Sequence, residues 1–175
     1  RRGFTQPDQN EETTPIDQTL LALQDLIKAG KIRHYGLSNE TPWGLSRWLH
    51  LADQGLGPRP VSVQNPYSLL NRQYEIGMAE FSYREKIPLL PYSPLAFGVL
   101  SGKYDNNQKP KDARLIKFDR FMRYNSDNTR KAAKAYNDLA REIGMTPAQM
   151  ALAFVNDRFF VASTIIGATN IEQLK

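Results

Sequence analysis

The chain has 175 residues, of which 41% are hydrophobic and 23% charged, so one globular domain with a packed core is expected. The formal net charge is +5, but the basic residues are scattered rather than clustered with aromatic residues, which argues against nucleic-acid binding. The chain has no cysteine and therefore no disulfide. Its two histidines are far apart in the sequence, so no zinc site is expected. No apolar run approaches the roughly 20 residues of a membrane span.

Both ends of the sequence indicate a piece of a longer protein. The chain opens at Arg1 without a methionine, and it stops at Lys175 shortly after the start of an expected helix. Export therefore cannot be judged from the N-terminus.

Short apolar runs alternate along the chain with segments of helical periodicity. Thr-Pro pairs at 14–15, 41–42 and 146–147 mark helix starts, and glycines at 30, 55 and 144 mark helix ends. In chain order we predict a polar loop over 1–13, a helix over 15–29, a strand over 32–37, a helix over 42–54, a strand over 61–64, a helix over 74–85, a strand over 87–91, a long loop over 96–127, helices over 128–143 and from 147, a strand over 162–166, and a helix from Asn170.

This alternation predicts an α/β fold with parallel strands and crossover helices packed outside them. Four strands are too few to close an eight-stranded barrel, which takes about 250 residues. Half a barrel would leave two sheet edges with unpaired backbone groups, through which copies of the chain could associate.

The segment 91–104, Pro-Tyr-Ser-Pro-Leu-Ala-Phe-Gly-Val-Leu-Ser-Gly-Lys-Tyr, is the most informative stretch. It follows the apolar run 87–90 and holds an aromatic ring, hydroxyls, two glycines and a lysine. A flat ligand ring can stack on Tyr92, the glycines let backbone amides approach an anion, and Lys103 adds a positive charge. These features suit a ligand with a ring at one end and phosphates at the other, although an ordinary surface turn has similar composition.

The other predicted strands also end in polar residues. Residues 32–39, 61–67 and 161–170 each begin with an apolar run that leads into Ser, Asn, Gln or Thr. Parallel α/β barrels place their active-site loops at these carboxyl ends of strands. We therefore expect the polar residues of the four segments to share one site.

Four segments together resemble the aldo-keto reductases: Gly-Lys-Ile-Arg-His-Tyr-Gly-Leu-Ser-Asn at 30–39, Val-Gln-Asn-Pro-Tyr at 63–67, Tyr-Ser-Pro-Leu through Leu-Ser-Gly-Lys-Tyr at 92–104, and Ile-Gly-Ala-Thr through Glu-Gln-Leu at 166–174. The chain is most similar to the subgroup of Tas-like bacterial reductases and potassium-channel β subunits, from about residue 15 to its end. The resemblance implies a (β/α)₈ barrel that binds NADP(H). Residues 1–175 would be its C-terminal half, about strands five to eight, with the N-terminal half absent.

The resemblance also implies a cofactor site. Ser38, Asn39 and Gln64 would face the nicotinamide carboxamide, because an amide side chain offers both a donor and an acceptor. Tyr92 would stack under the nicotinamide ring. The pyrophosphate side would be lined by Ser93, Pro94, Leu95, Gly98, Ser101 and Lys103, with Arg114 as a further phosphate contact, and the adenosine end by Gly167, Thr169 and Gln173. The alternatives are a buried barrel-layer role for Gln64, core packing for Tyr92 and a solvent-facing loop for the others.

No catalytic residue can be assigned in this chain. The resemblance implies an Asp, a Tyr, a Lys and a His from the first four strands, and none can be placed here, since His34 and His50 read as structural or exposed. Full length, the protein is expected to be a cytoplasmic oxidoreductase that reduces aldehydes or ketones, whereas the chain alone should be inactive. A non-catalytic NADP(H)-binding regulatory subunit and a self-associating half-barrel are the alternatives.

Overall fold

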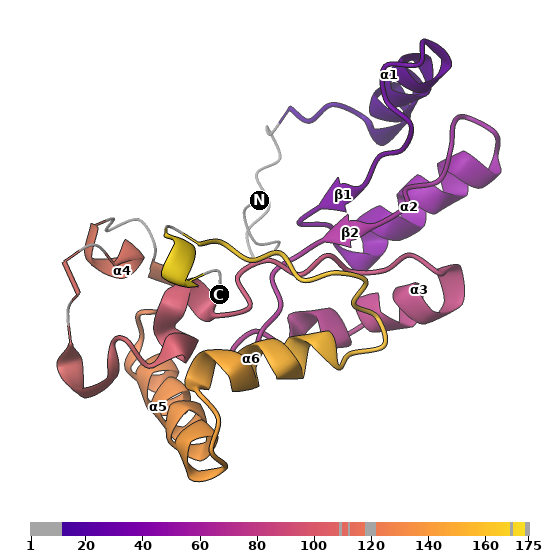
Figure 1. Cartoon of the computed structure of the whole chain (residues 1–175). Coiled ribbons are helices and arrows are strands. Elements are labelled where there is room, and N and C mark those ends of the chain that lie inside the picture. Colours follow the sequence, from indigo (N-terminus) through magenta and orange to yellow (C-terminus); the bar gives the residue numbers. More distant parts are fainter. Residues whose placement is uncertain (1–11, 109, 112, 118–121, 169, 174–175) are drawn as a thin grey trace. The chain divides into compact units, whose positions relative to one another are not determined.

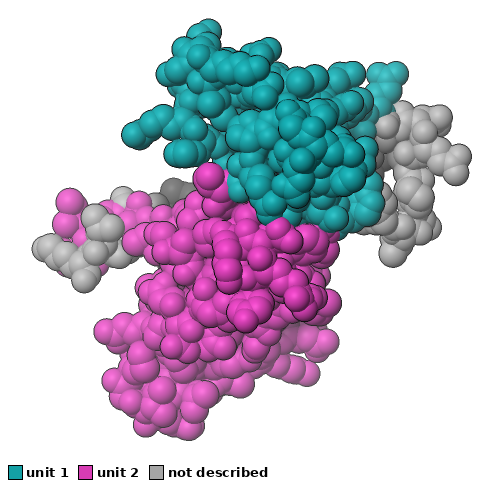
Figure 2. Space-filling model, turned by 90° about the vertical axis from the view of Figure 1, so that its right-hand side faces the viewer, with its two compact units in different colours: residues 1–35, 43–60 teal, residues 36–42, 61–175 magenta. Residues whose placement is uncertain are grey.

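The computed structural model describes residues 12–108, 110–111, 113–117, 122–168 and 170–173. The chain divides into two compact units, the first comprising residues 1–35 and 43–60 and the second residues 36–42 and 61–175 (Figure 2). Every predicted site residue lies in the second unit. No helix within the described ranges is both long enough and apolar enough to span a bilayer.

The first unit is helical. It holds α1 (Ile16–Lys28) and almost all of α2 (Pro42–Asp53), in agreement with the Thr-Pro and glycine signals in the sequence. Leu20 is fully buried, and Gly57 approaches it so closely that a Cβ would lie 2.9 Å from the leucine Cδ1. The Tyr35 hydroxyl donates to the carbonyl of Pro58 over 2.7 Å, and burial raises its pKa to about 12.

Four segments of the second unit pair in parallel and in chain order, which gives it an α/β character (Figure 1). In β1 (Leu37–Ser38) and β2 (Val63–Gln64), Leu37 lies opposite Val63. Val63 in turn bridges to Leu89, and Leu89 bridges to Val161. The expectation of parallel strands is confirmed for these pairings.

The predicted strand bounds were too wide. Regular ladder structure covers two residues each in β1 and β2, and the segments around Leu89 and Val161 pair only through single bridges. The strand predicted over 32–37 shrinks because Tyr35 packs into the helical unit, with its ring 5.9 Å from that of Trp48. An apolar run by itself does not say whether its side chains face a sheet neighbour or a helix.

The helix predicted over 74–85 is broken in two. A 3₁₀ turn, η1 (Gln73–Glu75), precedes α3 (Met78–Glu85), and Gly77 between them has φ +88°, a left-handed conformation that no helix interior accepts. The later helices begin as predicted. A side-chain cap at Ser126 starts α5 (Asp127–Glu142), and a capping box between Thr146 and Gln149 starts α6 (Pro147–Asn156).

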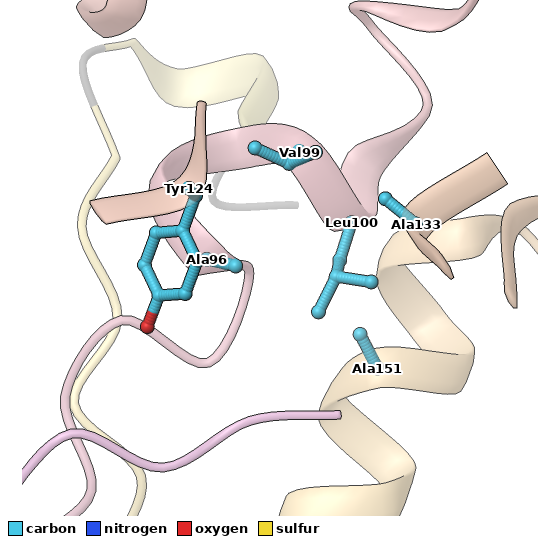
Figure 3. Close-up of a cluster of buried hydrophobic side chains, with 6 residues drawn as sticks. All are labelled: Ala96, Val99, Leu100, Tyr124, Ala133 and Ala151. Carbon is cyan, nitrogen blue, oxygen red and sulfur yellow. The ribbon is translucent and has the colours of Figure 1, made fainter. Parts of the chain in front are cut away.

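The long loop predicted over 96–127 proved to be partly helical. It contains η2 (Ala96–Ser101), η3 (Asp105–Asn107), α4 (Arg114–Lys117) and η4 (Met122–Tyr124). The buried side chains of η2 form a hydrophobic cluster with residues of η4, α5 and α6, and η2 packs against α5 and α6 (Figures 1 and 3). Its members are Ala96, Val99, Leu100, Tyr124, Ala133 and Ala151. The small alanines of α5 and α6 allow η2 to approach closely. Where a final helix was predicted, the structure has the short turn η5 (Ile171–Gln173).

Candidate functional site

Polar side chains from three neighbouring segments meet where those segments end. The backbone N–H of Asn39, just after β1, donates to the carbonyl of Gln64 over 2.9 Å. The Tyr92 hydroxyl donates to Asn39 Oδ1 over 2.6 Å, although the two residues are 53 positions apart. Ser38 is the last residue of β1, so the structure brings all four of these predicted residues to one edge.

The backbone at this edge is held in an uncommon conformation. Asn39 has φ +54° and Ser93 has φ +56°, and such left-handed non-glycine residues gather at functional sites. The Asn65 side chain braces the first of these turns. Its Oδ1 accepts from the N–H of Glu40 over 2.9 Å, and its Nδ2 donates to the Glu40 carbonyl over 2.7 Å. The Asn65 carbonyl also accepts from the N–H of Tyr92, so one residue connects both turns.

The loop after Tyr92 folds its lysine back over a glycine. Ala96, Phe97 and Gly98 are left-handed in succession, with φ +47°, +59° and +94°. A Cβ on Gly98 would collide with Lys103 Cε and would lie 2.7 Å from its Nζ, so the lysine side chain runs across the bare glycine. The Ser101 hydroxyl donates to the Gly98 carbonyl over 2.8 Å. Predicted residues 98, 101 and 103 therefore form one tight loop.

The remaining predicted residues are placed less directly. Pro94 is buried, and Leu95 packs against the hydrophobic cluster of η2. Gly167 is exposed and lies two residues after Ile165, whose N–H donates to the Pro91 carbonyl. The structure gives only the backbone of Arg114, in α4, and of Gln173, in η5, while Thr169 lies outside the described residues.

Comparison with known proteins decides the family. Residues 5–175 match the aldo/keto reductase family. The chain belongs to that family. It is 53% identical over 173 residues to Protein tas of Escherichia coli, which covers 99% of this chain and 50% of that protein. It is 41% identical to an aldo-keto reductase of Babesia bovis, over 95% of this chain and 60% of that protein.

A more distant relative is the L-glyceraldehyde 3-phosphate reductase of Escherichia coli, at 29% identity over 94% of this chain and 49% of that protein. The chain thus spans about half to three fifths of the length of these relatives. The resemblance to aldo-keto reductases stated from the sequence is confirmed, and the Tas-like subgroup is consistent with the high identity to Protein tas.

The chemistry of the candidate site is that of amides, a phenol ring and cations. Within the described ranges, no group of three or more histidine, aspartate or glutamate side chains is placed to hold a metal ion. Asn39 and the phenol ring of Tyr92 can contact a flat ring that carries an amide. Lys103, with Nζ 5.3 Å from the centre of the Tyr104 ring, can contact an anion. These groups fit a nicotinamide dinucleotide.

Sequence reasoning missed two residues of this site. Asn65 stands in the Val-Gln-Asn-Pro segment beside Gln64, and its two amide contacts could have been suspected from that position. Arg123 in η4 is an exposed cation, and a hydrogen bond to the Tyr92 hydroxyl raises the pKa of its guanidinium. No local pattern relates Arg123 to Tyr92, because the two are far apart in the sequence.

Proposed function

We propose that the natural protein carrying this chain is an NADP(H)-dependent oxidoreductase that reduces aldehydes or ketones to alcohols. The chain would supply the C-terminal half, about strands five to eight, of a (β/α)₈ barrel in the cytoplasm. The observation that carries the proposal is the 2.6 Å hydrogen bond from Tyr92 to Asn39. It sets an aromatic ring beside an amide at the carboxyl ends of parallel segments, where barrel enzymes bind their ligands.

The residues divide between the two ends of such a cofactor. Asn39 and Gln64, with Ser38 beside them, would hold the nicotinamide carboxamide, because each amide offers one donor group and one acceptor. The Tyr92 ring would support the face of the nicotinamide. When bound, the cofactor supplies a hydride to the carbonyl carbon of the substrate. The contribution of these residues is to orient the ring and to fix which of its faces is exposed.

The loop over 93–103, which we call the lysine loop, would take the phosphates. Lys103 lies across Gly98, where only a glycine leaves room for its side chain, and a charge-assisted contact from lysine to phosphate is a strong one. Ser93, Ser101, Pro94 and Leu95 shape this loop. Arg114 would add a second cation. The N–H of its neighbour Leu115 donates to the Tyr104 hydroxyl over 3.3 Å, which ties α4 to the lysine loop. Gly167, Thr169 and Gln173 would hold the adenosine end.

The test is a fluorescence titration of the natural full-length protein with NADPH and, in parallel, with NADH. We expect Lys103→Ala to weaken NADPH binding about 10- to 100-fold, since a hydrogen bond to a charged group contributes about 1.5–3 kcal/mol. Lys131→Ala is the matched control, because it removes the same charge from an exposed position on α5. Equal affinities for Lys103→Ala and the wild type would refute the phosphate role.

Turnover separates the enzyme from its alternatives. NADPH oxidation is followed with a panel of aldehydes and ketones that includes glyceraldehyde 3-phosphate, named in one of the relatives. Tight NADPH binding without turnover of any carbonyl compound would favour a regulatory subunit. The 175-residue chain assayed alone should show no turnover, and light scattering of that sample reports whether it self-associates through its sheet edges.

A further inference from the structure

A cluster of three polar side chains fastens the lysine loop to helix α5. We call Asp105, Asn137 and Arg141 the loop clamp. Asn137 Nδ2 donates to Asp105 Oδ1 over 2.9 Å, and Arg141 Nη2 pairs with Asp105 Oδ2 at 2.5 Å. Asn137 is 1% exposed and the Asp105 side chain 13% exposed, so the contact between these two is largely shielded from water, whereas the Arg141 side chain is 48% exposed.

The side-chain amide of Asn137 contacts the loop on both sides of Lys103 in the sequence. Besides its bond to Asp105, Asn137 Nδ2 donates to the carbonyl of Val99 over 3.2 Å. Val99 precedes Lys103 in the chain and Asp105 follows it. The segment between these two anchors contains Lys103, whose side chain crosses Gly98, the residue just before Val99, so the position of the lysine depends on Asn137.

The close passage of the loop along α5 also requires a glycine. Gly102 has φ +79°, and a Cβ there would lie 2.8 Å from Arg141 Nη2 and 3.3 Å from Pro147 Cγ. The residue next to Lys103 is therefore seated directly against the arginine of the clamp. A larger residue at this position would force the end of the Arg141 side chain to move and would so disturb the clamp.

The clamp buries polar atoms where apolar side chains would pack α5 against the core with greater stability. The neighbouring buried positions of α5 are Ala133 and Ala140, and an apolar residue at position 137 would fit the same face. Instead, Asn137 Oδ1 is buried without a hydrogen-bond partner among the described residues. An unpaired buried polar atom destabilises a fold, so packing alone does not account for Asn137.

We propose that Asp105, Asn137 and Arg141 are positioning residues that hold Lys103 ready for the cofactor phosphate. The inference rests on the proposed function. It adds that the affinity for NADPH depends on a loop fixed in advance by α5, so that little ordering is required when the cofactor binds.

The test is a double-mutant cycle on NADPH affinity in the natural full-length protein. Asp105→Asn keeps an acceptor for Asn137 and removes only the charge that pairs with Arg141. We expect it to weaken NADPH binding about tenfold in the wild type and less than about twofold in the Lys103→Ala background. Asp138→Asn is the matched control. It removes the other carboxylate that Arg141 contacts, at 3.0 Å, on an exposed part of α5 without touching the loop, and it should leave the affinity unchanged.

A merely structural role would give the same fold-loss in both backgrounds, and that additivity would overturn the inference while leaving the cofactor site intact. No loss from Asp105→Asn in the wild type would overturn it as well. If Asp105→Asn does not fold, Arg141→Gln breaks the same ion pair from its more exposed side and replaces it in the cycle. Absence of NADPH binding by the wild type would instead refute the proposed function itself.

Discussion

The substitution Gly98→Ala tests whether the lysine loop acts through the position of its lysine. Gly98 has φ +94°, and the added Cβ would meet Lys103 Cε and Nζ, with Tyr104 Cε2 at 3.5 Å. The obstructed atoms are the far end of a flexible side chain. Lys103 can therefore rotate away, and the fold survives while the charge moves.

Gly98→Ala is expected to have two effects, a loss of folding stability and a loss of NADPH affinity. Alanine in a left-handed conformation costs roughly 1–2 kcal/mol, partly offset by about 0.4–1 kcal/mol from the stiffer unfolded chain. A net cost of about 1 kcal/mol lowers the melting temperature of a domain of 150–250 residues by about 2–4 °C. The displaced lysine adds the loss of a charge-assisted phosphate contact, about 1.5–3 kcal/mol, which corresponds to 10- to 100-fold weaker NADPH binding.

The control variant Gly144→Ala separates the effect of backbone strain from the effect of displacing the Lys103 side chain. Gly144 has φ +75°, and a Cβ there has no atom within 4 Å, so this variant carries the backbone strain alone. Thermal melting should show similar losses of stability for the two variants, whereas NADPH fluorescence titration should show weaker binding only for Gly98→Ala. Wild-type affinity in Gly98→Ala, or an equal loss in Gly144→Ala, would refute the reasoning.

Three further outcomes follow from single contacts. Tyr92→Phe keeps the ring but loses the hydrogen bond to Asn39, so NADPH titration should show a loss of about 2- to 10-fold. Arg72 holds the pKa of Glu75 below its usual 4.5, so the benefit of this pair is complete above that pH and disappears as the pH falls. The stability difference between wild type and Glu75→Gln in urea unfolding, at most about 1 kcal/mol at pH 7, should therefore shrink as the pH is lowered below 4.5. Thr146→Ala removes the capping box of α6 and should cost about 1 kcal/mol, measured by the same unfolding.

Local signals predicted the helices best. The Thr-Pro pair at 146–147 with Gln149 three residues after Thr146 is a complete start signal, and the structure has the capping box there. The break at Gly77 could also have been suspected, because glycine weakens a helix interior. Strand bounds were harder to predict, since pairing depends on the neighbouring segment. Tyr35 shows this, because its ring packs into the helical unit instead of extending β1.

The segment over 96–127 was misjudged because its partners are distant in sequence. Leu100 of η2 lies in one buried cluster with Ala133 of α5 and Ala151 of α6 (Figure 3). The sequence of this segment lacks the periodicity of a regular helix and does not predict this packing. In the structure, three successive left-handed residues, Ala96–Gly98, interrupt the helical turn. Because the residues around Lys103 are polar, the local sequence predicts a loop there. The structure retains polar surface here and buries Val99, Leu100 and Tyr124.

Some residues of the candidate site could be predicted from local sequence, whereas others depend on partners that are distant in the sequence. Asn39, Gln64 and Tyr92 follow apolar runs, and parallel strands bring their carboxyl ends to one edge, so their meeting could be predicted from the order of segments. Asn137 has no such signal, because an asparagine on an amphipathic helix is ordinarily solvent-facing. It is buried, and it reaches Asp105, 32 residues away. A polar side chain on the apolar face of a helix breaks the local rule, and such breaks concentrate at functional sites. For this reason the clamp, and not the motif residues alone, determines where the charge of the lysine loop stands.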